Sequence, residues 1–165
     1  AGAYGTEIKD VLQDVTGLTR AGEEVTLTPE QLNMTYRHGN LPPDFIALSA
    51  TLKGQPEEQE TVRQRLKDIK ARRNETQPIR EQTGGSTFAN PSDDMRAWQV
   101  VEQVDGRGLT IGGAKMSEMH CNFMTNTGNA TAANLEALGD ELITRAKTKL
   151  DINLKWEIQR IGEEA

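Results

Sequence analysis

The sequence has very few of the residues that would build a disulfide-stapled, metal-bound or membrane-spanning protein. Of its 165 residues only Cys121 is a cysteine, and aromatic residues make up only 4% of the chain. A single cysteine excludes an intrachain disulfide and a cysteine-rich zinc site, and it fits a reducing cytoplasm as the compartment. His38, His120 and Cys121 lack the spacing of metal ligands. No run of about 18 apolar residues occurs, so no spanning helix is predicted.

A surplus of positive charge is also missing. Lysine and arginine together number 19 against 25 acidic residues, a net charge of −6. Binding to nucleic acid or to an anionic membrane needs a broad basic surface, so the charge argues against both, although a local group of arginines could bind one anionic ligand. The chain does not open on methionine, and its opening residues lack the basic and apolar regions of a signal peptide. We therefore expect upstream sequence to be missing.

The first half of the chain has the pattern of short, alternating elements. Apolar residues within 8–15 suit a short helix or an irregular strand. Thr28 followed by Pro29 is typical of a helix start, because a hydroxyl caps the helix and proline tolerates its first position. Three more elements are expected: a strand at 24–27, a loop at 35–43 and a strand, buried mainly on one face, at 44–52.

The clearest helix of the first half is expected over residues 56–74. Proline and glutamates stand near its start and basic residues near its end, which complements the helix dipole. Val62, Leu66 and Ile69 form a narrow apolar stripe, so the helix should pack on one side and be solvated on the other. The basic run within this helix is better explained as the solvated face than as a phosphate site.

Two helices and several strands are expected in the second half, and together they predict an α+β layer. One helix covers 95–104, with Trp98, Val101 and Val104 facing inward. The other covers 131–149, capped by Asn129 or Thr131, and carries an apolar stripe of Leu135, Leu138, Leu142, Ile143 and Ala146. Strands are expected at 109–115, 122–126 and 153–161.

The segment TGGSTFANP, residues 83–91, is the most informative stretch. Its two glycines allow positive φ and a close approach of a ligand to the backbone. Alone, Ser86 is either a turn residue or a hydroxyl presented to a ligand, and the turn is the commoner case. The segment contains no GxSxG nucleophile elbow, and the chain contains no phosphate-binding GxxxxGK[ST] loop. The pair Gly112–Gly113 could also approach a ligand, although a bulge is the commoner explanation.

Four motifs carry a resemblance to one family. They are TYRHGNLP at 35–42, TGGSTFANP at 83–91, GRGLTIGGAKMSEMHCNFMTNTGNAT at 106–131 and WEIQRIGE at 156–163. In this order and without large gaps, the sequence resembles the UDP-N-acetylenolpyruvoylglucosamine reductases, the MurB family, and looks most like its shorter, type II branch. The resemblance covers nearly the whole chain.

The resemblance implies a flavin enzyme of peptidoglycan precursor synthesis. In the family, NADPH reduces FAD, and the flavin delivers hydride to the enolpyruvyl double bond of UDP-N-acetylglucosamine enolpyruvate to give UDP-N-acetylmuramate. Hydride addition leaves negative charge beside the substrate carboxylate. The reaction therefore needs a cation for the carboxylate, an acid that stabilises the enediolate, and a proton for the second carbon.

Carried over position by position, the resemblance implies three catalytic residues. Ser86 matches the proton donor, Arg37 the arginine that contacts the substrate carboxylate, and Glu157 the carboxyl group that completes the triad. Arginine suits that role because its planar fork binds a carboxylate bidentately. Further substrate contacts are implied at Tyr36, Arg80, Asn90 and His120. The opening residues Gly2, Ala3, Tyr4 and Gly5 resemble the last part of the flavin-binding surface.

The sequence departs from the family in two ways. Ala89 stands where many members carry a lysine, so one positive contact to the substrate is absent or supplied elsewhere. The family's first flavin-binding lobe has no counterpart in this chain. We therefore expect residues 1–80 to be the tail of a flavin-binding domain of the PCMH type and 81–165 to be a small α+β substrate-binding domain, inactive without the missing N-terminal lobe. A sugar-nucleotide-binding module without redox activity is the alternative.

Overall fold

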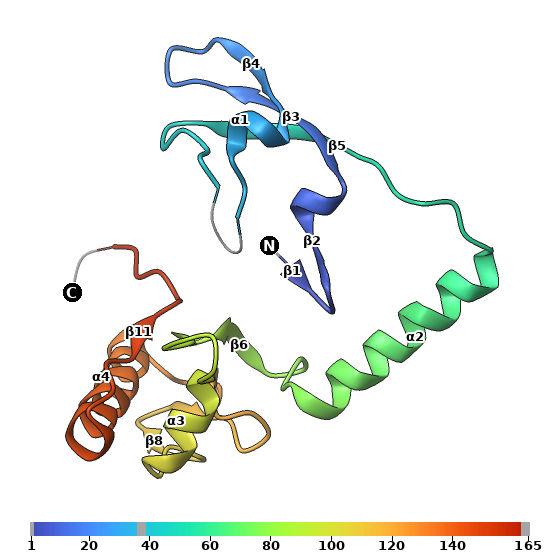
Figure 1. Ribbon diagram of the computed structural model, residues 1–165. Helices are drawn as coiled ribbons and strands as arrows, with labels where there is room; N and C mark the ends of the chain where they lie inside the picture. The colour runs from blue at the N-terminus through green and yellow to red at the C-terminus, as the bar shows by residue number, and fades with distance from the viewer. Residues whose placement is uncertain (1, 36–38, 163–165) are drawn as a thin grey trace. The chain divides into compact units, whose positions relative to one another are not determined.

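The computed structural model describes residues 2–35 and 39–162 and divides into two compact units, Ala1–Gln59 and Glu60–Ala165 (Figure 1). The first unit is built on an antiparallel sheet with the strand order β4-β3-β5, and β1 and β2 form a separate hairpin. Its elements are β1 (Gly2–Ala3), β2 (Thr6–Glu7), a 3-10 helix (Ile8–Asp10), β3 (Leu12–Leu18), β4 (Glu24–Leu27), α1 (Pro29–Leu32) and β5 (Ile46–Leu52).

The sequence predicted these elements better than it predicted their burial. The strand at 24–27 and the helix start are confirmed, and the Thr28 hydroxyl accepts a hydrogen bond from the backbone N–H of Gln31. The segment 8–15 holds a turn of 3-10 helix followed by the start of a strand. The prediction that the strand at 44–52 is buried on one face is wrong, because every residue of β5 is exposed. β5 is an edge strand, and the small core of this unit is formed by Leu12, Val15 and Leu32.

The second unit combines an antiparallel sheet of strand order β6-β10-β9-β8, a two-stranded ribbon of β7 and β11, and helices. Its architecture is α+β. Its elements are α2 (Gln59–Thr76, which begins one residue before the unit), β6 (Gln82–Ser86), β7 (Phe88–Ala89), α3 (Ala97–Gln103), β8 (Thr110–Ile111), β9 (Ala114–Met116), β10 (Phe123–Asn126), α4 (Ala132–Leu150) and β11 (Lys155–Trp156).

The core of this unit lies between the sheet and the two helices α3 and α4, which contact each other (Figure 1). The predicted stripe of α4 is confirmed: Leu138, Leu142 and Ala146 are fully buried, and Leu135 and Ile143 are partly buried. Thr131, not Asn129, caps α4, since its hydroxyl accepts a hydrogen bond of 3.2 Å from the N–H of Asn134. Long amphipathic periodicity therefore identified the helix that holds the core together.

Three sequence expectations for this unit are wrong in detail. Trp98 is 39% exposed instead of inward, because α3 begins at Ala97 and turns Ala97, Val100, Val101 and Val104 to the core. Most of the apolar stripe of α2 is exposed, since no residue of α2 is fully buried, Val62 and Leu66 are 39% and 53% exposed, and only Ile69 is partly buried. The last strand is only β11, far shorter than 153–161.

The pair Gly112–Gly113 forms the tight turn between β8 and β9. Gly112 has φ +55°, and a Cβ on Gly113 would overlap the backbone N of Ala130. The glycines therefore serve the packing of a hairpin turn against the start of α4, a fully structural reason for their presence.

Candidate active site

Ser86 is the last residue of β6, at the point where the chain leaves the larger sheet. It follows Gly85, whose φ is +89°, and it pairs with Phe123 of β10. The next two residues, Thr87 and Phe88, are both fully buried, and the pairing partner of the chain changes from β10 to β11 between Ser86 and Phe88. The chain therefore passes from the larger sheet to the ribbon at Thr87, and Ser86 is left partly buried at the junction of the two sheets, with no hydrogen bond of its hydroxyl among the described residues.

Buried hydrogen bonds hold the chain where it passes from one sheet to the other at Thr87. The Thr87 hydroxyl accepts a hydrogen bond of 3.1 Å from the N–H of Met124. The carboxamide of Asn122 bonds both backbone groups of Phe88: it accepts from the N–H at 2.9 Å and donates to the carbonyl at 2.8 Å. The Asn122 carbonyl also accepts from the N–H of Thr87 at 2.7 Å. We call these hydrogen bonds the Asn122 clamp. The sequence pattern predicted a strand at residue 122 and gave no sign of the clamp, because its partner Phe88 lies 34 residues away in the chain.

Glu157 reaches the same junction from the C-terminal end of the chain. β11 runs antiparallel to β7, with Trp156 opposite Phe88, and the N–H of Glu157 donates to the carbonyl of Thr87 at 2.8 Å. The Phe88 and Trp156 rings pack with their centroids 5.4 Å apart, which holds the two strands together. Ser86 and Glu157 are therefore brought onto neighbouring backbone segments although 70 residues separate them in the sequence, and Glu157 is exposed.

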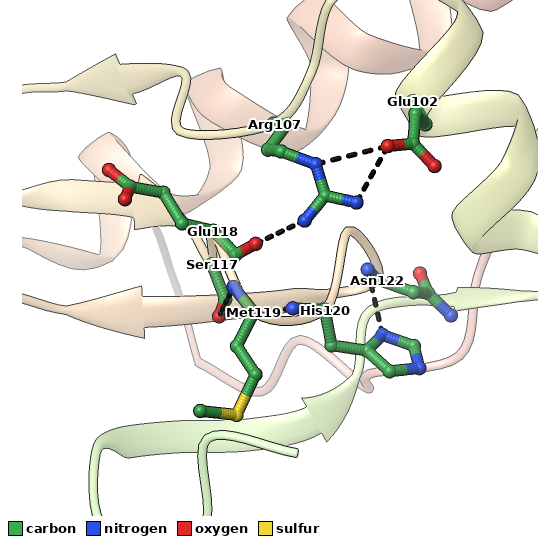
Figure 2. A network of polar contacts seen from close by, with 7 residues as sticks. All are labelled: Glu102, Arg107, Ser117, Glu118, Met119, His120 and Asn122. Atoms are coloured by element: carbon green, nitrogen blue, oxygen red, sulfur yellow. Dashed lines mark hydrogen bonds and ion pairs between the residues drawn. The ribbon is translucent and has the colours of Figure 1, made fainter. Parts of the chain in front are cut away.

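His120 lies in the loop that precedes β10 (Figure 2). Its Nδ1 accepts a hydrogen bond of 3.2 Å from the N–H of Asn122, and its ring meets that of Phe123 edge-on with centroids 4.7 Å apart. Partial burial lowers the pKa of His120 below its ordinary value of 6.5, so the neutral ring is favoured. Because Nδ1 acts as acceptor in the neutral ring, Nε2 carries the proton and is the donor that His120 can offer to a ligand.

Arg107 anchors the loop that carries His120 to the end of α3 (Figure 2). Its Nε and Nη2 donate to a carboxylate oxygen of Glu102 at 3.0 and 2.6 Å, and its Nη1 donates to the backbone carbonyl of Glu118. The Ser117 hydroxyl holds the same loop by accepting from the N–H groups of Met119 and His120. Sequence reasoning did not single out Arg107, since an arginine between two glycines gives no signal of a partner.

Asn90 and Arg80 were predicted to contact the substrate. The Asn90 side-chain oxygen accepts a hydrogen bond of 3.1 Å from the N–H of Ala97, so it holds the first residue of α3. Arg80 is exposed in the turn after α2 and lines a hollow of about 360 Å³ together with Met119 of the His120 loop. The structure thus places Arg80 beside that loop, and the substrate contacts of both residues stay predictions.

The other predicted residues lie in the first unit. Gly2 and Ala3 form β1, and Tyr4 and Gly5 form the tight turn to β2. Both turn residues have positive φ, 55° at Tyr4 and 83° at Gly5, and a Cβ on Gly5 would meet nothing within 4 Å. The tip of this turn is therefore open. Tyr36 and Arg37, with their predicted roles in substrate binding and catalysis, lie outside the described residues.

A groove of about 420 Å³ lies between the start of β6, the start of α4 and the segment after β11. Its walls are largely apolar, with Met124, Leu135, Trp156 and Ile158 among them. Arg160 covers one end, where its guanidinium lies 5.3 Å from the centre of the Trp156 ring. Across residues 2–35 and 39–162, no group of three or more His, Cys, Asp or Glu could hold a metal ion, and no helix is long and apolar enough to cross a membrane.

The second unit is thus a small α+β domain that presents a serine and a carboxylate at the junction of two sheets. Residues 77–161 match the family model described as the C-terminal domain of UDP-N-acetylenolpyruvoylglucosamine reductase. The chain belongs to this family.

Two curated relatives carry that reductase name. The one from Sphingopyxis alaskensis is 47% identical over 162 residues, which cover 98% of this chain and 54% of the relative. The one from Novosphingobium aromaticivorans is 48% identical over 161 residues and is covered to the same 54%. The crystal structure of the reductase from Thermus caldophilus has 29% identity and a TM-score of 0.79, over 95% of this chain and 56% of that one. The chain spans about half the length of the curated relatives it matches.

Proposed function

We propose that this chain is the C-terminal part of a bacterial, cytoplasmic enzyme that reduces UDP-N-acetylglucosamine enolpyruvate to UDP-N-acetylmuramate for peptidoglycan precursor synthesis. The observation that carries the proposal is the pairing of β7 with β11, which brings Ser86 and Glu157 to one junction. Relatives that carry the reductase name and match nearly the whole chain support it.

The reaction sets the role of each residue. Reduction adds a hydride to the terminal carbon of the enolpyruvyl group, and the negative charge then spreads onto the carboxylate. Arg37 holds that carboxylate in a bidentate ion pair, and Glu157 stabilises the charged intermediate by hydrogen bonding. Ser86 gives a proton to the second carbon, which completes the saturated product. The absence of a hydrogen-bond partner for the Ser86 hydroxyl within the described chain leaves it available for this role.

FAD, reduced by NADPH, supplies the hydride when it is bound. The open turn at Tyr4 and Gly5 fits the approach of a large cofactor, because a Cβ on Gly5 would meet nothing within 4 Å and Tyr4 is 47% exposed. We assign Gly2, Ala3, Tyr4 and Gly5 to the cofactor surface. Residues 1–80 then belong to the flavin-binding domain and 81–165 to the substrate-binding domain, a division supported by the family match that begins at residue 77.

The chain spans about half the length of these relatives and matches the C-terminal domain of the family, so we expect the 165 residues alone to lack turnover and to need an N-terminal lobe as a partner. The same observation favours one alternative, a sugar-nucleotide-binding module without redox activity. The two functions differ in what the protein does with NADPH.

The test uses protein expressed from its complete reading frame and reconstituted with FAD. We expect a flavin spectrum and NADPH oxidation that depends on UDP-N-acetylglucosamine enolpyruvate. Ser86→Ala should leave reduction of the flavin by NADPH intact and slow the following transfer to substrate by at least about 100-fold. Ser92→Ala, at an exposed position directly after this segment, is the matched control. Binding of the sugar nucleotide without flavin or NADPH oxidation would establish the alternative instead.

A further inference from the structure

Lys155 lies on the outer face of the ribbon formed by β7 and β11. In this ribbon Lys155 stands opposite Ala89, and Trp156 stands opposite Phe88. Phe88 is fully buried and packs against Trp156, so that pair faces the core. Because successive side chains of a strand point to opposite faces, Lys155 and Ala89 share the outer face. Ala89 covers little of that face, and the Lys155 side chain is exposed.

The ammonium group of Lys155 has no carboxylate partner among the described residues. The other lysines of residues 110–162 all have one: Lys115 pairs with Glu118, Lys147 with Asp151 and Lys149 with Asp105. The chain carries a net charge of −6, so acidic groups are not scarce on its surface. A cation left unpaired at this place is therefore available to an anion from outside the chain.

The position of Lys155 near Ser86 and Glu157 indicates which anion it binds. Glu157 follows β11, two residues after Lys155, and its side chain is exposed like that of Lys155. The N–H of Glu157 bonds the carbonyl of Thr87, the residue after Ser86. Lys155 thus stands two residues before Glu157 on the segment that presents the carboxylate, and opposite Ala89, which follows Ser86 by three residues.

We infer that Lys155 binds an anionic group of the sugar nucleotide and is a specificity-determining residue of this enzyme. The inference rests on the proposed function, in which the substrate carries a diphosphate and a carboxylate. Both offer anionic oxygens, and an ammonium with three rotatable donors binds either as a point charge. Lys155 acts in substrate binding and takes no part in the proton transfer.

Steady-state kinetics of the protein expressed from its complete reading frame test this inference. Lys155→Gln should raise the KM for UDP-N-acetylglucosamine enolpyruvate roughly tenfold, because a charge-assisted hydrogen bond is lost, and should change kcat and the KM for NADPH by less than about twofold. Lys155→Arg should retain most of the affinity. Lys147→Gln, which removes the same charge from a paired lysine on α4, is the control and should change nothing.

A cross-strand rescue tests the geometry. Cβ atoms of directly opposed residues lie about 4.5–5.5 Å apart, so Ala89→Lys can return an ammonium to the same face. The double variant Ala89→Lys with Lys155→Gln should recover most of the lost affinity. Uridine diphosphate as inhibitor separates the two anions: weaker inhibition of Lys155→Gln assigns the contact to the diphosphate, and unchanged inhibition with a raised KM assigns it to the carboxylate.

An unchanged KM in Lys155→Gln overturns the inference while an active wild-type enzyme keeps the proposed function standing. A double variant whose KM is as high as that of Lys155→Gln also overturns it, because an ammonium on the same face would then not restore substrate binding. Wild-type protein that does not oxidise NADPH with this substrate refutes the proposed function itself.

Discussion

Replacement of Asn122 by alanine should destabilise the second unit and loosen the segment that carries Ser86. The Asn122 side chain is buried and makes two hydrogen bonds, one to the N–H and one to the carbonyl of Phe88. Phe88 is itself fully buried. Alanine removes both hydrogen-bonding groups and leaves the N–H and the carbonyl of Phe88 without these partners.

The size of the effect follows from the two backbone groups that lose their partners. An unsatisfied buried donor or acceptor costs about 1–3 kcal/mol, so we expect Asn122→Ala to lower the free energy of unfolding by about 2–5 kcal/mol. Domains of this size have a total stability of about 5–15 kcal/mol. The loss is therefore a large share of the total, and the urea midpoint should fall by roughly 1–2 M.

Tryptophan fluorescence during urea unfolding measures this loss for the second unit alone, because both tryptophans, Trp98 and Trp156, lie within it. Asn153→Ala is the matched control: Asn153 is exposed and has no hydrogen bond of its side chain among the described residues, so its change should stay within about 0.5 kcal/mol. If Asn122→Ala lowers the free energy of unfolding by less than about 0.5 kcal/mol, the hydrogen bonds of Asn122 to Phe88 do not stabilise this unit.

Asn122→Asp separates the two hydrogen bonds of the clamp. The carboxylate can still accept from the Phe88 N–H, but its second oxygen faces the Phe88 carbonyl, which can only accept. A buried carboxylate in this place binds a proton more readily than the unfolded chain does. Its stability deficit against wild type should therefore shrink as the pH falls toward the ordinary pKa of an aspartate, about 4, and stay constant below it. A deficit that is constant with pH would show that the donor half of the clamp is unimportant.

Three further predictions concern the frame around this junction. Gly139→Ala should cost about 1–3 kcal/mol of stability in the same urea assay, because its Cβ would overlap the Trp156 ring; a neutral result would mean that the ring can move aside. Thr131→Ala should cost about 1 kcal/mol through loss of the α4 cap, whereas Thr131→Ser should be neutral. Burial lowers the pKa of His120, so below the ordinary value of 6.5 the unfolded chain binds more protons and stability should fall as the pH falls. His120→Gln should remove that part of the pH dependence, and an unchanged slope would contradict it.

The parts of the fold that the sequence predicted are those determined by local periodicity. The helix 131–149 has an apolar stripe from Leu135 to Ala146, about three turns, and a hydroxyl cap, and both were confirmed in α4. Burial in the first unit was not predictable in the same way. Ile46 and Leu48 of β5 have the composition of a buried strand but are 63% and 58% exposed, because a strand pattern says which residues share a face and not whether another layer covers it.

The residues of the candidate site could be proposed from the sequence, but the contacts that support them could not. Ser86 and Glu157 were predicted through motifs that resemble a family, and their roles stay predictions; the structure adds how the two distant segments come together. Asn122 and Arg107 gave no signal in the sequence, since each acts by hydrogen bonds to backbone groups far away in the chain. Such contacts depend on strand register, and register is fixed only when the whole sheet forms.

The register that places Glu157 beside Thr87 depends on packing on the far side of β11. Gly139 on α4 has no side chain, which lets the Trp156 ring lie against the helix. Trp156 then meets Phe88, and this pair sets β11 opposite β7 with Glu157 at the end of the pairing. A slip of one residue would move Glu157 away from Thr87 and turn the side chains of β11 to the opposite faces. A glycine on a helix and an aromatic pair thus determine where the carboxylate of the candidate site stands, although Gly139 and Phe88 are themselves buried.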